Sequence, residues 1–497
     1  MKKARNLVCL ILGLLLLMPA VSSCAKEGTE ANPAADTTTA GAEETTEAPP
    51  ETEPVDPRLL IEDGLPEKKF DGQNFTLYLR GGPDIYQPDD FVAEESSGDI
   101  LVNAVYERNR DVSERFDINF QYNFDTSNNT GYATTAFLSI RANEDVNDIM
   151  GLHGSYCFYY ASAGLILDWN QNMMYNDLSK PWWDADFQNN MTLAGKLYGM
   201  TGSISHNSIG STFCMLFNKE ILKNANLDYP YDAVRDGSWT YDKFHSLCTA
   251  ATVDLNGDGV FKPEDDQFGV YSGGWRFPVS IFYMGGDRIY SYDEDNGLTM
   301  TIYNERTVSI TDDLKEFYKE PSVIIEGYHG SGSSLFKEGR VLFWGDSMKT
   351  LQNVRDYELD IGIVPYPKYD ESLTRYYSLV DAGANVFTVP VTAQRLEMIS
   401  IITEALAAEG YKKVVPAFYE VGLKAKYARD TDTAEMLEII TDSRWFDVGY
   451  YEADVNRTLS YIGRSILFDK IEFSSFCKST SAGMQKSLEK MIAKFVK

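Results

Sequence analysis

The segment FTLYLRGG, Phe75–Gly82, alternates apolar and polar residues and then reaches two glycines, which predicts a strand that runs into a loop. A helical pattern follows near Leu101–Phe116, then an alternating segment at Asp117–Phe124, a helical stretch around 133–143, and a short strand and loop within Asp145–Tyr156. The order strand, helix, strand, helix, strand predicts a mainly parallel sheet with helices on its faces. The fold class is therefore α/β.

The carboxyl ends of these strands are where we expect a ligand, because ligands on open parallel sheets bind beyond the carboxyl ends of the strands. Two polar loops, Arg80–Gly82 and His153–Tyr156, follow the first and the third predicted strands. Aromatic residues make up 13% of the chain, which suits stacking on flat, weakly polar ligands. Packing in the core remains the ordinary role of any single ring.

Length and charge limit the class of protein. A chain of 497 residues, 43% of them hydrophobic, can bury a large core, and its length predicts two or three domain-sized units. The net charge of −29 argues against binding to nucleic acid, anionic lipid surfaces or acidic substrates.

The N-terminus has the features of an export signal. A basic start precedes the apolar run Leu7–Pro19, which is too short for a comfortable membrane span and ends in small residues. Val21–Ser23 ahead of Cys24 resembles a bacterial lipobox, although Val21 stands where the pattern more often has Leu. We expect residues 1–23 to be a signal peptide and Cys24 to carry acyl chains of the palmitate type, with a plain secretory signal as the alternative. Each buried CH₂ is worth about 0.8 kcal/mol, so two or more chains anchor a protein firmly.

The composition of residues 24–66 predicts a disordered linker, because Thr, Glu, Ala and Pro dominate and large apolar residues are nearly absent. The body that follows contains four cysteines. They lie far apart with no Cys-x-x-Cys spacing, so we expect free, mostly buried thiols. These cysteines are Cys157, Cys214, Cys248 and Cys477.

One loop has the spacing of an EF-hand calcium site. Asp254–Asp265, DLNGDGVFKPED, has short oxygen-bearing side chains at the first, third and fifth places, a glycine at the sixth and a carboxylate at the twelfth. Lys262 at the ninth place cannot ligate, and the twelfth residue is Asp instead of Glu, so an acidic turn is the alternative. The predicted ligands of a structural Ca²⁺ are Asp254, Asn256, Asp258, Asp265 and, through its carbonyl, Val260.

Enzyme signatures are absent from the sequence, which contains no GxSxG, GxxxxGK[ST], GxGxxG or HExxH motif. The four histidines are scattered, and none has the spacing of a metal-binding pair. We interpret the carboxylate pairs Asp89–Asp90, Glu94–Glu95 and Asp265–Asp266 as solvated surface instead of a glycosidase acid/base couple. No catalytic residue is assigned, and the sequence favours a binding protein over an enzyme.

Several segments together resemble the family 1 extracellular solute-binding proteins, the sugar-binding subunits of bacterial ABC importers, in the maltose-binding-like class. Their order and spacing span nearly the whole body. The segments are the lipobox at Cys24, AVYERNRDVSERFDINF (Ala104–Phe120), MLFNKEIL (Met215–Leu222), DGSWTYDKF (Asp236–Phe244), the cation loop followed by DDQFGV, LFKEGRVLFW (Leu335–Trp344) and IGIVPYPK (Ile361–Lys368).

The resemblance implies two α/β lobes with a cleft that closes on the ligand. Crossing segments should lie near Gly202–Thr212 and Pro365–Asp381. The implied boundaries are 67–206 and 376–430 for the first lobe, and 207–375 and 431–497 for the second.

The resemblance also implies a set of ligand-binding positions, of which Trp275, set between two glycines and an arginine, is the strongest candidate. The full set is Arg80, Gly82, Asp84, His153, Tyr156, His206, Asn207, Trp275, Arg276, Trp344, Asp346, Asp381 and Asn385.

The resulting hypothesis is a monomeric, lipid-anchored receptor on the extracellular face of the cell membrane. It would capture a carbohydrate, most simply an oligosaccharide, and deliver it to the permease subunits of an ABC importer. The alternatives are a surface enzyme acting on glycans and a receptor for a peptide or another solute.

Overall fold

The computed structural model describes residues 56–81, 88–93, 98–272, 276–292, 297–325, 333–354, 357–423, 431–452 and 472–495. Asp56–Lys497 form one compact unit. The signal peptide, Cys24 and most of the linker lie outside the described residues, as do three of the predicted site residues, Gly82, Asp84 and Trp275.

The first predicted sheet is present, with strand order β12-β3-β1-β2. β1 pairs in parallel with β2 and β3, whereas β12 joins β3 antiparallel. Helix α2 (Ile100–Phe116) follows β1, and Asp99 begins it by accepting hydrogen bonds from two backbone amides. Helix α3 (Asn129–Arg141) separates β2 from β3. The predicted order of elements is confirmed. The strands are β1 (Gln73–Arg80), β2 (Ile118–Asp125), β3 (Ile149–His153) and β12 (Asn385–Thr388).

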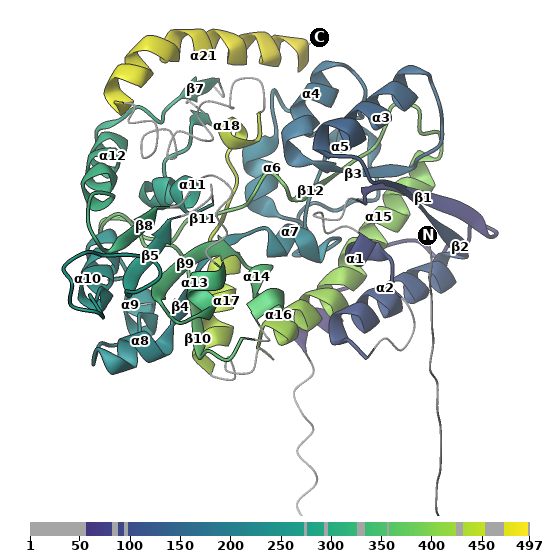
Figure 1. Cartoon of the computed structure of the whole chain (residues 1–497). Coiled ribbons are helices and arrows are strands. Elements are labelled where there is room, and N and C mark those ends of the chain that lie inside the picture. Colours follow the sequence, from purple (N-terminus) through teal and green to yellow (C-terminus); the bar gives the residue numbers. More distant parts are fainter. Residues whose placement is uncertain are drawn as a thin grey trace, which may run out of the picture. The chain divides into compact units, whose positions relative to one another are not determined.

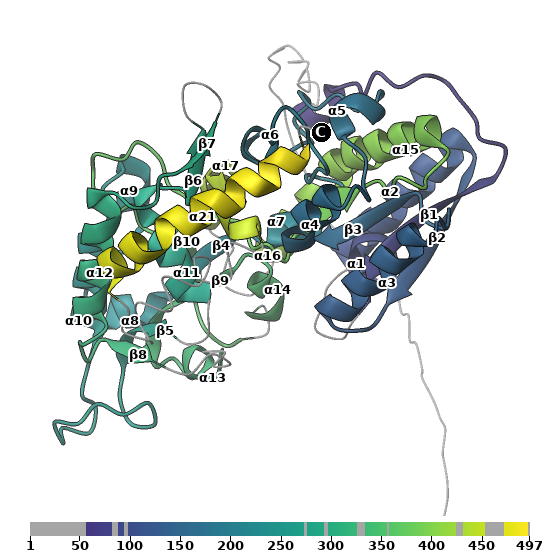
Figure 2. The ribbon, with the colours of Figure 1, turned by 90° about the horizontal axis from the view of Figure 1, so that it is seen from above.

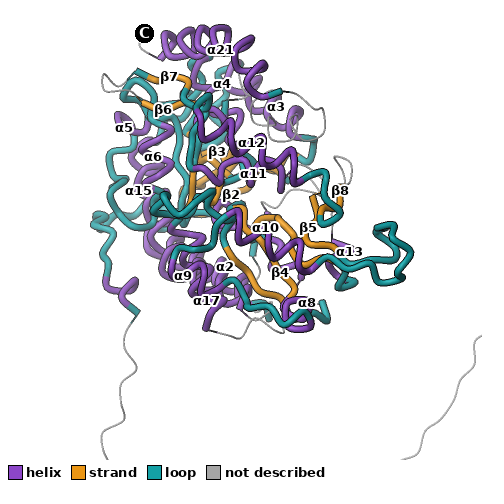
Figure 3. The backbone as a smooth tube through the Cα atoms, turned by 90° about the vertical axis from the view of Figure 1, so that its left-hand side faces the viewer, coloured by secondary structure: helices purple, strands orange, loops and turns teal. Residues whose placement is uncertain are grey.

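A second sheet has the order β10-β4-β9-β5-β8 and contains both parallel and antiparallel pairs. Helices α8 (Lys219–Asn224) and α10 (Tyr241–Ala251) pack against it (Figure 3). The fold is thus a mixed α/β arrangement with two sheets. The strands are β4 (Phe213–Asn218), β5 (Phe268–Ser272), β8 (Val323–Ile325), β9 (Val341–Ser347) and β10 (Ile361–Val364).

Two chain segments connect the sheets. The first contains the short helix α7 (His206–Gly210), here called the hinge helix, and leads into β4 (Figure 1). The second returns from β10 through β11 (Ser378–Leu379) to β12. The segments contact each other, because the backbone amide of Asp381 donates to the carbonyl of Ser211 over 3.0 Å.

A continuous helical stretch forms a third connection. It consists of α15 (Leu396–Glu409), the π-helical turn η4 (Gly410–Val414) and α16 (Val415–Leu423). Its beginning packs on α2 and its end on α14 (Thr350–Val354). A side chain at Gly410 would lie 2.1 Å from the carbonyl oxygen of Ser203, so glycine is required where the stretch meets the first crossing segment.

The C-terminal helix α21 (Phe473–Phe495) contacts helices that are far apart in the chain. It runs from beside α12 (Glu305–Phe317) to α4 (Cys157–Ser162) (Figure 2). The ring of Phe473 lies 6.0 Å from that of Phe282, and the ring of Phe495 lies 5.3 Å from that of Tyr198.

The four body cysteines are free and buried, as predicted. Among the described residues, no helix has the length and apolar character needed to cross a membrane.

The remaining elements are short. They are η1 (Pro57–Leu60), α1 (Pro88–Phe91), η2 (Gly154–Tyr156), α5 (Trp169–Asn172), α6 (Ala185–Met191), α9 (Tyr231–Asp236), α11 (Arg276–Phe282), η3 (Tyr283–Gly285), β6 (Tyr290–Tyr292), β7 (Leu298–Met300), α13 (Ser333–Lys337), α17 (Thr431–Asp442), β13 (Arg444–Trp445) and α18 (Val448–Tyr451).

Candidate ligand-binding site

Polar side chains gather where the two crossing segments meet the carboxyl ends of β1 and β3. They come from β1, β3 and α1, from the hinge helix, from the end of β9 and from the turn before β12. We call this group the polar cluster. Its members are Arg80, Asp90, His153, His206, Asn207, Lys349, Asp381 and Asn385.

Asp90 lies at the centre of the polar cluster and is completely buried. Its carboxylate accepts hydrogen bonds of 3.0 Å from the backbone amide of Asn207 and from the side-chain amide of Asn385, and another from the hydroxyl of Ser205. The Nε2 atom of His206 lies 3.4 Å away. These donors offset the cost of burying a carboxylate, so Asp90 joins helix α1 to both crossing segments.

Two carboxylates that the sequence predicted to be solvated are therefore buried. Asp90 and Asp266 both have an exposed fraction of 0%, whereas Asp89 is exposed. Asp266 accepts hydrogen bonds from the backbone amides of Leu255 and Lys262, at 2.9 and 2.8 Å. The prediction was wrong for these two because the donors that satisfy each carboxylate are assembled only by the folded backbone. The third predicted pair, Glu94–Glu95, lies outside the described residues.

Arg80 ends β1 with its side chain buried, and its guanidinium donates a 2.6 Å hydrogen bond to the carbonyl of Gly383. Burial, together with the charge of Arg80, holds the pKa of His153 well below its usual value. Burial raises the pKa of Asp381, although its carboxylate accepts from the amide of Gly383 at 2.9 Å and from the hydroxyl of Tyr450 at 3.3 Å. The strand ends and the return segment thus share one polar environment.

Lys349 follows β9 and is a member of the polar cluster that the sequence did not indicate. Its ammonium donates a 3.0 Å hydrogen bond to the side-chain oxygen of Asn207. Burial lowers the pKa of Lys349 to about 7; the carboxylates of Asp90 and Asp89 oppose this shift and the charge of Arg80 adds to it. A lone lysine in a polar segment has no distinguishing sequence pattern, so only the fold reveals this contact.

Arg276 and Asp346 form an ion pair beside the cluster, with 3.3 Å between Nε and Oδ1. Burial raises the pKa of Asp381, and the positive charge of Arg276 partly offsets this rise. Trp344 differs from these residues, because its side chain is only 5% exposed and its ring lies 5.4 Å from that of Phe336. The structure places it in the core of the second sheet.

The sequence-derived set therefore divides into three groups. Seven positions meet in one region, two form the adjoining ion pair, and the others are either packed in the core or outside the described residues. The ring of Tyr156 lies 5.9 Å from that of His153. The seven positions are Arg80, His153, Tyr156, His206, Asn207, Asp381 and Asn385.

The predicted calcium loop is closed by hydrogen bonds within itself. Asp254 accepts from the backbone amides of Gly257 and Gly259, both at 2.7 Å, and Asp258 accepts from that of Val260. The ammonium of Lys262 lies 3.4 Å from a carboxylate oxygen of Asp258. No three Asp, Glu, His or Cys side chains are grouped for a metal within the described ranges. The Ca²⁺ site stays a prediction.

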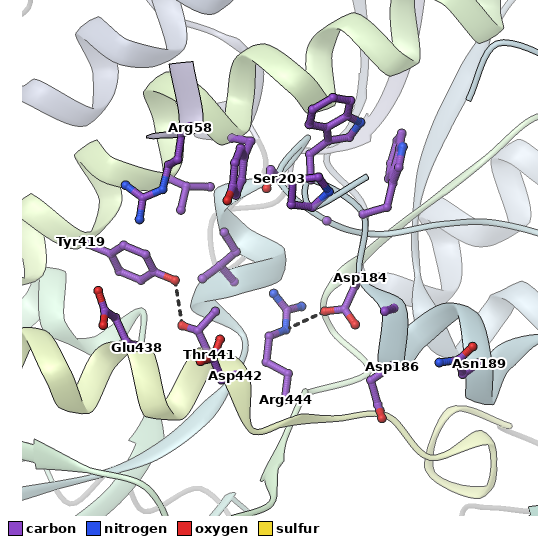
Figure 4. A pocket seen from close by; sticks show the side chains of 18 of the residues that line it. Arg58, Asp184, Asp186, Asn189, Ser203, Tyr419, Glu438, Thr441, Asp442 and Arg444 are labelled. Atoms are coloured by element: carbon purple, nitrogen blue, oxygen red, sulfur yellow. Dashed lines mark hydrogen bonds and ion pairs between the residues drawn. The ribbon is translucent and has the colours of Figure 1, made fainter. Parts of the chain in front are cut away.

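A cavity of about 690 Å³, here called the hinge cavity, lies elsewhere (Figure 4). Its walls include Gly202, Ser203 and Ile209 of the first crossing segment, but none of the predicted site residues that the structure describes. The sequence did not indicate it. The other lining residues are Arg58, Pro181, Trp182, Trp183, Asp184, Ala185, Asp186, Asn189, Arg375, Tyr411, Val415, Tyr419, Glu438, Thr441, Asp442 and Arg444.

Comparison with known proteins gives structural neighbours only. No family model matches the chain, and no curated protein matches it. An ABC substrate-binding protein of Listeria monocytogenes, solved in complex with cycloalternan, is 15% identical, with a TM-score of 0.56 over 84% of this chain and 100% of that chain.

Two further solved structures are similar over comparable lengths. The GacH receptor of Streptomyces glaucescens, solved unliganded and with acarbose, is 12% identical, with a TM-score of 0.54 over 85% of this chain and 100% of that one. The sugar-binding protein MalE of Xanthomonas citri is 11% identical, with a TM-score of 0.56 over 85% and 98%. The chain therefore has the two-lobed α/β fold of sugar-binding ABC substrate-binding proteins.

Proposed function

We propose that this chain is a substrate-binding protein that captures a carbohydrate, most simply an oligosaccharide, and delivers it to an ABC importer. The observation that carries the proposal is the position of the polar cluster. Its members come from the strand ends of the first sheet, from the end of β9 in the second sheet, and from both crossing segments. A ligand held there touches both lobes at once.

Simultaneous contact with both lobes supplies the physical basis of capture. A ligand shifts a hinge equilibrium only by its difference in affinity between the two states. If the lobes separate, a ligand keeps its contacts to one sheet and loses those to the other. Binding therefore favours the closed state, as in other hinged two-domain proteins.

The chemistry of the cluster suits hydroxyl groups. Each sugar hydroxyl is both a donor and an acceptor. The cluster offers guanidinium and ammonium donors on Arg80 and Lys349, and a carboxylate acceptor on Asp381. The solved structures with a similar fold were crystallised with cycloalternan and with acarbose, which supports a carbohydrate as the ligand class for this chain as well.

The N-terminal sequence supports the cellular setting of the proposal. Lipidation at Cys24 would hold the protein at the extracellular face of the membrane, and the linker up to residue 66 would let the body reach permease subunits. Capture by a single hinged chain needs no second copy, so we propose a monomer that contacts the membrane through its lipid alone.

An enzymatic role has less support. Asp90 already accepts three hydrogen bonds and is buried, so it is poorly placed to exchange a proton with a substrate. The residues of the polar cluster are better suited to holding a ligand than to transforming it. A peptide or another solute is the remaining alternative ligand.

The test is a thermal-shift screen of the full chain against mono- and oligosaccharides and a peptide library, with recovery of the ligand afterwards. The expected result is stabilisation by one carbohydrate class and recovery of intact sugar. Stabilisation by peptides alone would contradict the ligand class, and release of smaller sugars would contradict the non-enzymatic role.

A further inference from the structure

Two separate parts of the fold form the walls of the hinge cavity. One wall is the segment 181–186, continued by Asn189 of α6, which follows the first sheet in the chain. The opposite wall comes from α17 and from Arg444 of β13. Tyr411 and Tyr419 of the long helical stretch also line the cavity. The hydroxyl of Tyr419 lies 2.7 Å from that of Thr441 on α17 (Figure 4). Movement of one wall against the other would change the width of this cavity and would break the ion pair between Asp184 and Arg444.

Contacts within one wall and between the two walls hold them in place. The indole N–H groups of Trp182 and Trp183 donate to the two carboxylate oxygens of Glu404, at 2.9 and 2.8 Å. Arg444 Nε lies 3.0 Å from a carboxylate oxygen of Asp184. These buried contacts need no ligand to form, so the cavity is preformed, as is usual for small-molecule sites.

The charges that line the cavity are nearly balanced and of both signs. Three arginines and four acidic residues line it, which gives the lining a net charge of about −1. Within this set Asp184 pairs with Arg444, and Asp186 pairs with Arg288 outside the lining. The three arginines would repel a bound cation at short range, and the four carboxylates would repel a bound anion. A neutral molecule rich in hydroxyl groups avoids both penalties, because each hydroxyl donates to a carboxylate or accepts from a guanidinium.

Several lining groups remain accessible to such a molecule. The side chains of Asn189, Glu438 and Asp442 are exposed, and the rings of Tyr411 and Tyr419 are half-buried. Phenol rings present an apolar face with a polar tip, which matches a sugar ring. A volume of about 690 Å³ lies within the range of about 300–1,000 Å³ that small-molecule pockets occupy.

We propose that the hinge cavity is a second ligand site, which binds a small neutral polyhydroxylated molecule of one or two rings and thereby biases the hinge. The hinge helix supplies the link to the polar cluster. The guanidinium of Arg444 donates to the carbonyl of Ser208 over 3.2 Å, and Lys349 donates to the side chain of the neighbouring Asn207 over 3.0 Å. A ligand between the two cavity walls favours the hinge angle that accommodates it.

The test is titration calorimetry of the full chain with glucose, maltose and myo-inositol, and with choline and citrate as charged probes. The cavity variant is Asn189→Trp, which places a large ring over an exposed lining position. The matched control is Asn224→Trp, an exposed position at the end of α8 that does not line the cavity. Glu438→Gln removes one carboxylate with little change of shape, and Glu107→Gln, exposed on α2, is its control.

The expected result is a neutral polyol that binds at two sites. Asn189→Trp should weaken one of them at least tenfold, Glu438→Gln should weaken the same site several-fold, and both controls should leave it unchanged. Arg80→Met should weaken only the other site. If Arg80→Met loses one binding site and Asn189→Trp loses none, the proposal of a second site in the hinge cavity is overturned. Binding of only choline or citrate, or binding of no probe at all, would overturn it as well. Loss in Asn189→Trp alone would instead contradict the proposed role of the polar cluster.

Discussion

The ammonium of Lys349 lies 3.0 Å from the side-chain oxygen of Asn207, and this hydrogen bond joins the end of β9 to the hinge helix. Burial keeps the pKa of Lys349 near 7, below its ordinary value of 10.5. The folded protein therefore binds fewer protons at this site than the unfolded chain does between pH 7 and 10.5, so this site makes the free energy of unfolding rise with pH across that window.

Lys349→Met should remove this contribution. The variant should gain stability relative to the native chain at pH 6.5 and lose that advantage as the pH approaches 9.5, while sugar affinity falls because the link to the hinge helix is lost. Urea unfolding at several pH values measures the effect. Lys223→Met, at an exposed position on α8, is the control, and an identical pH profile for the two variants would contradict the prediction.

Arg80→Met should weaken carbohydrate binding at least tenfold. The change removes a buried guanidinium and leaves the carbonyl of Gly383 without this donor, which costs about 1–3 kcal/mol of stability. Calorimetry measures the affinity, and urea unfolding separates it from loss of fold. Arg110→Met is the control, since Arg110 is exposed and pairs with its neighbour Asp111. Unchanged affinity in a folded Arg80→Met protein would place the ligand elsewhere.

Glu404 should make the protein less stable as the pH rises from about 4.5 to 7. Its carboxylate is completely buried between the two indole donors, and burial raises its pKa from 4.5 to about 7. The stabilising contribution is fully present below pH 4.5 and is lost as the pH rises towards 7. At about 1.4 kcal/mol for each pKa unit, the loss is about 3 kcal/mol.

Glu404→Gln should flatten this pH dependence and lower stability at pH 5, because an amide accepts through one oxygen only. Unfolding midpoints measured from pH 4.5 to 8 provide the check. Glu397→Gln on the same helix, whose carboxylate is exposed and paired with Lys68, should keep the native decline. A native-like decline in Glu404→Gln would show that another group is responsible.

The predicted calcium loop should respond to the residue at its ninth place. Lys262 pairs with Asp258, a predicted ligand, and competes with a cation for it. Lys262→Gln should therefore strengthen Ca²⁺-dependent thermal stabilisation, and Asp254→Ala should abolish it. Asp228→Ala, at an exposed position outside the loop, should behave like the native chain. No thermal shift at millimolar Ca²⁺ in either the native chain or Lys262→Gln would mean that the loop is an acidic turn.

Cys24→Ala should release the protein from the membrane and leave ligand binding intact, because the site lies in the body of the chain. Membrane fractionation and an uptake assay measure the two effects. Normal membrane association of the variant would contradict lipidation at Cys24, and normal uptake by a released variant would show that the anchor is dispensable.

The sequence by itself determined the local elements of the first sheet. Alternation in β1 and β2 and the helical spacing in α2 arise from residues two to four positions apart, and these periods record which side of a strand or helix is buried. The resemblance also placed Arg80, His153, Asn207 and Asn385 near one another, because strand ends and crossing segments follow from the order of elements.

Only the tertiary structure decided which of these side chains meet and which additional residues join them. Asp90 and Asp266 lie in runs of acidic residues, yet they are buried because backbone amides and amide side chains from distant segments converge on them. Lys349 reaches the hinge helix from 142 positions away. Trp344 has an aromatic ring that could stack on a ligand, but this ring packs on Phe336. Local periodicity carries no information about contacts between residues far apart in the chain, since those contacts depend on how the two sheets are joined.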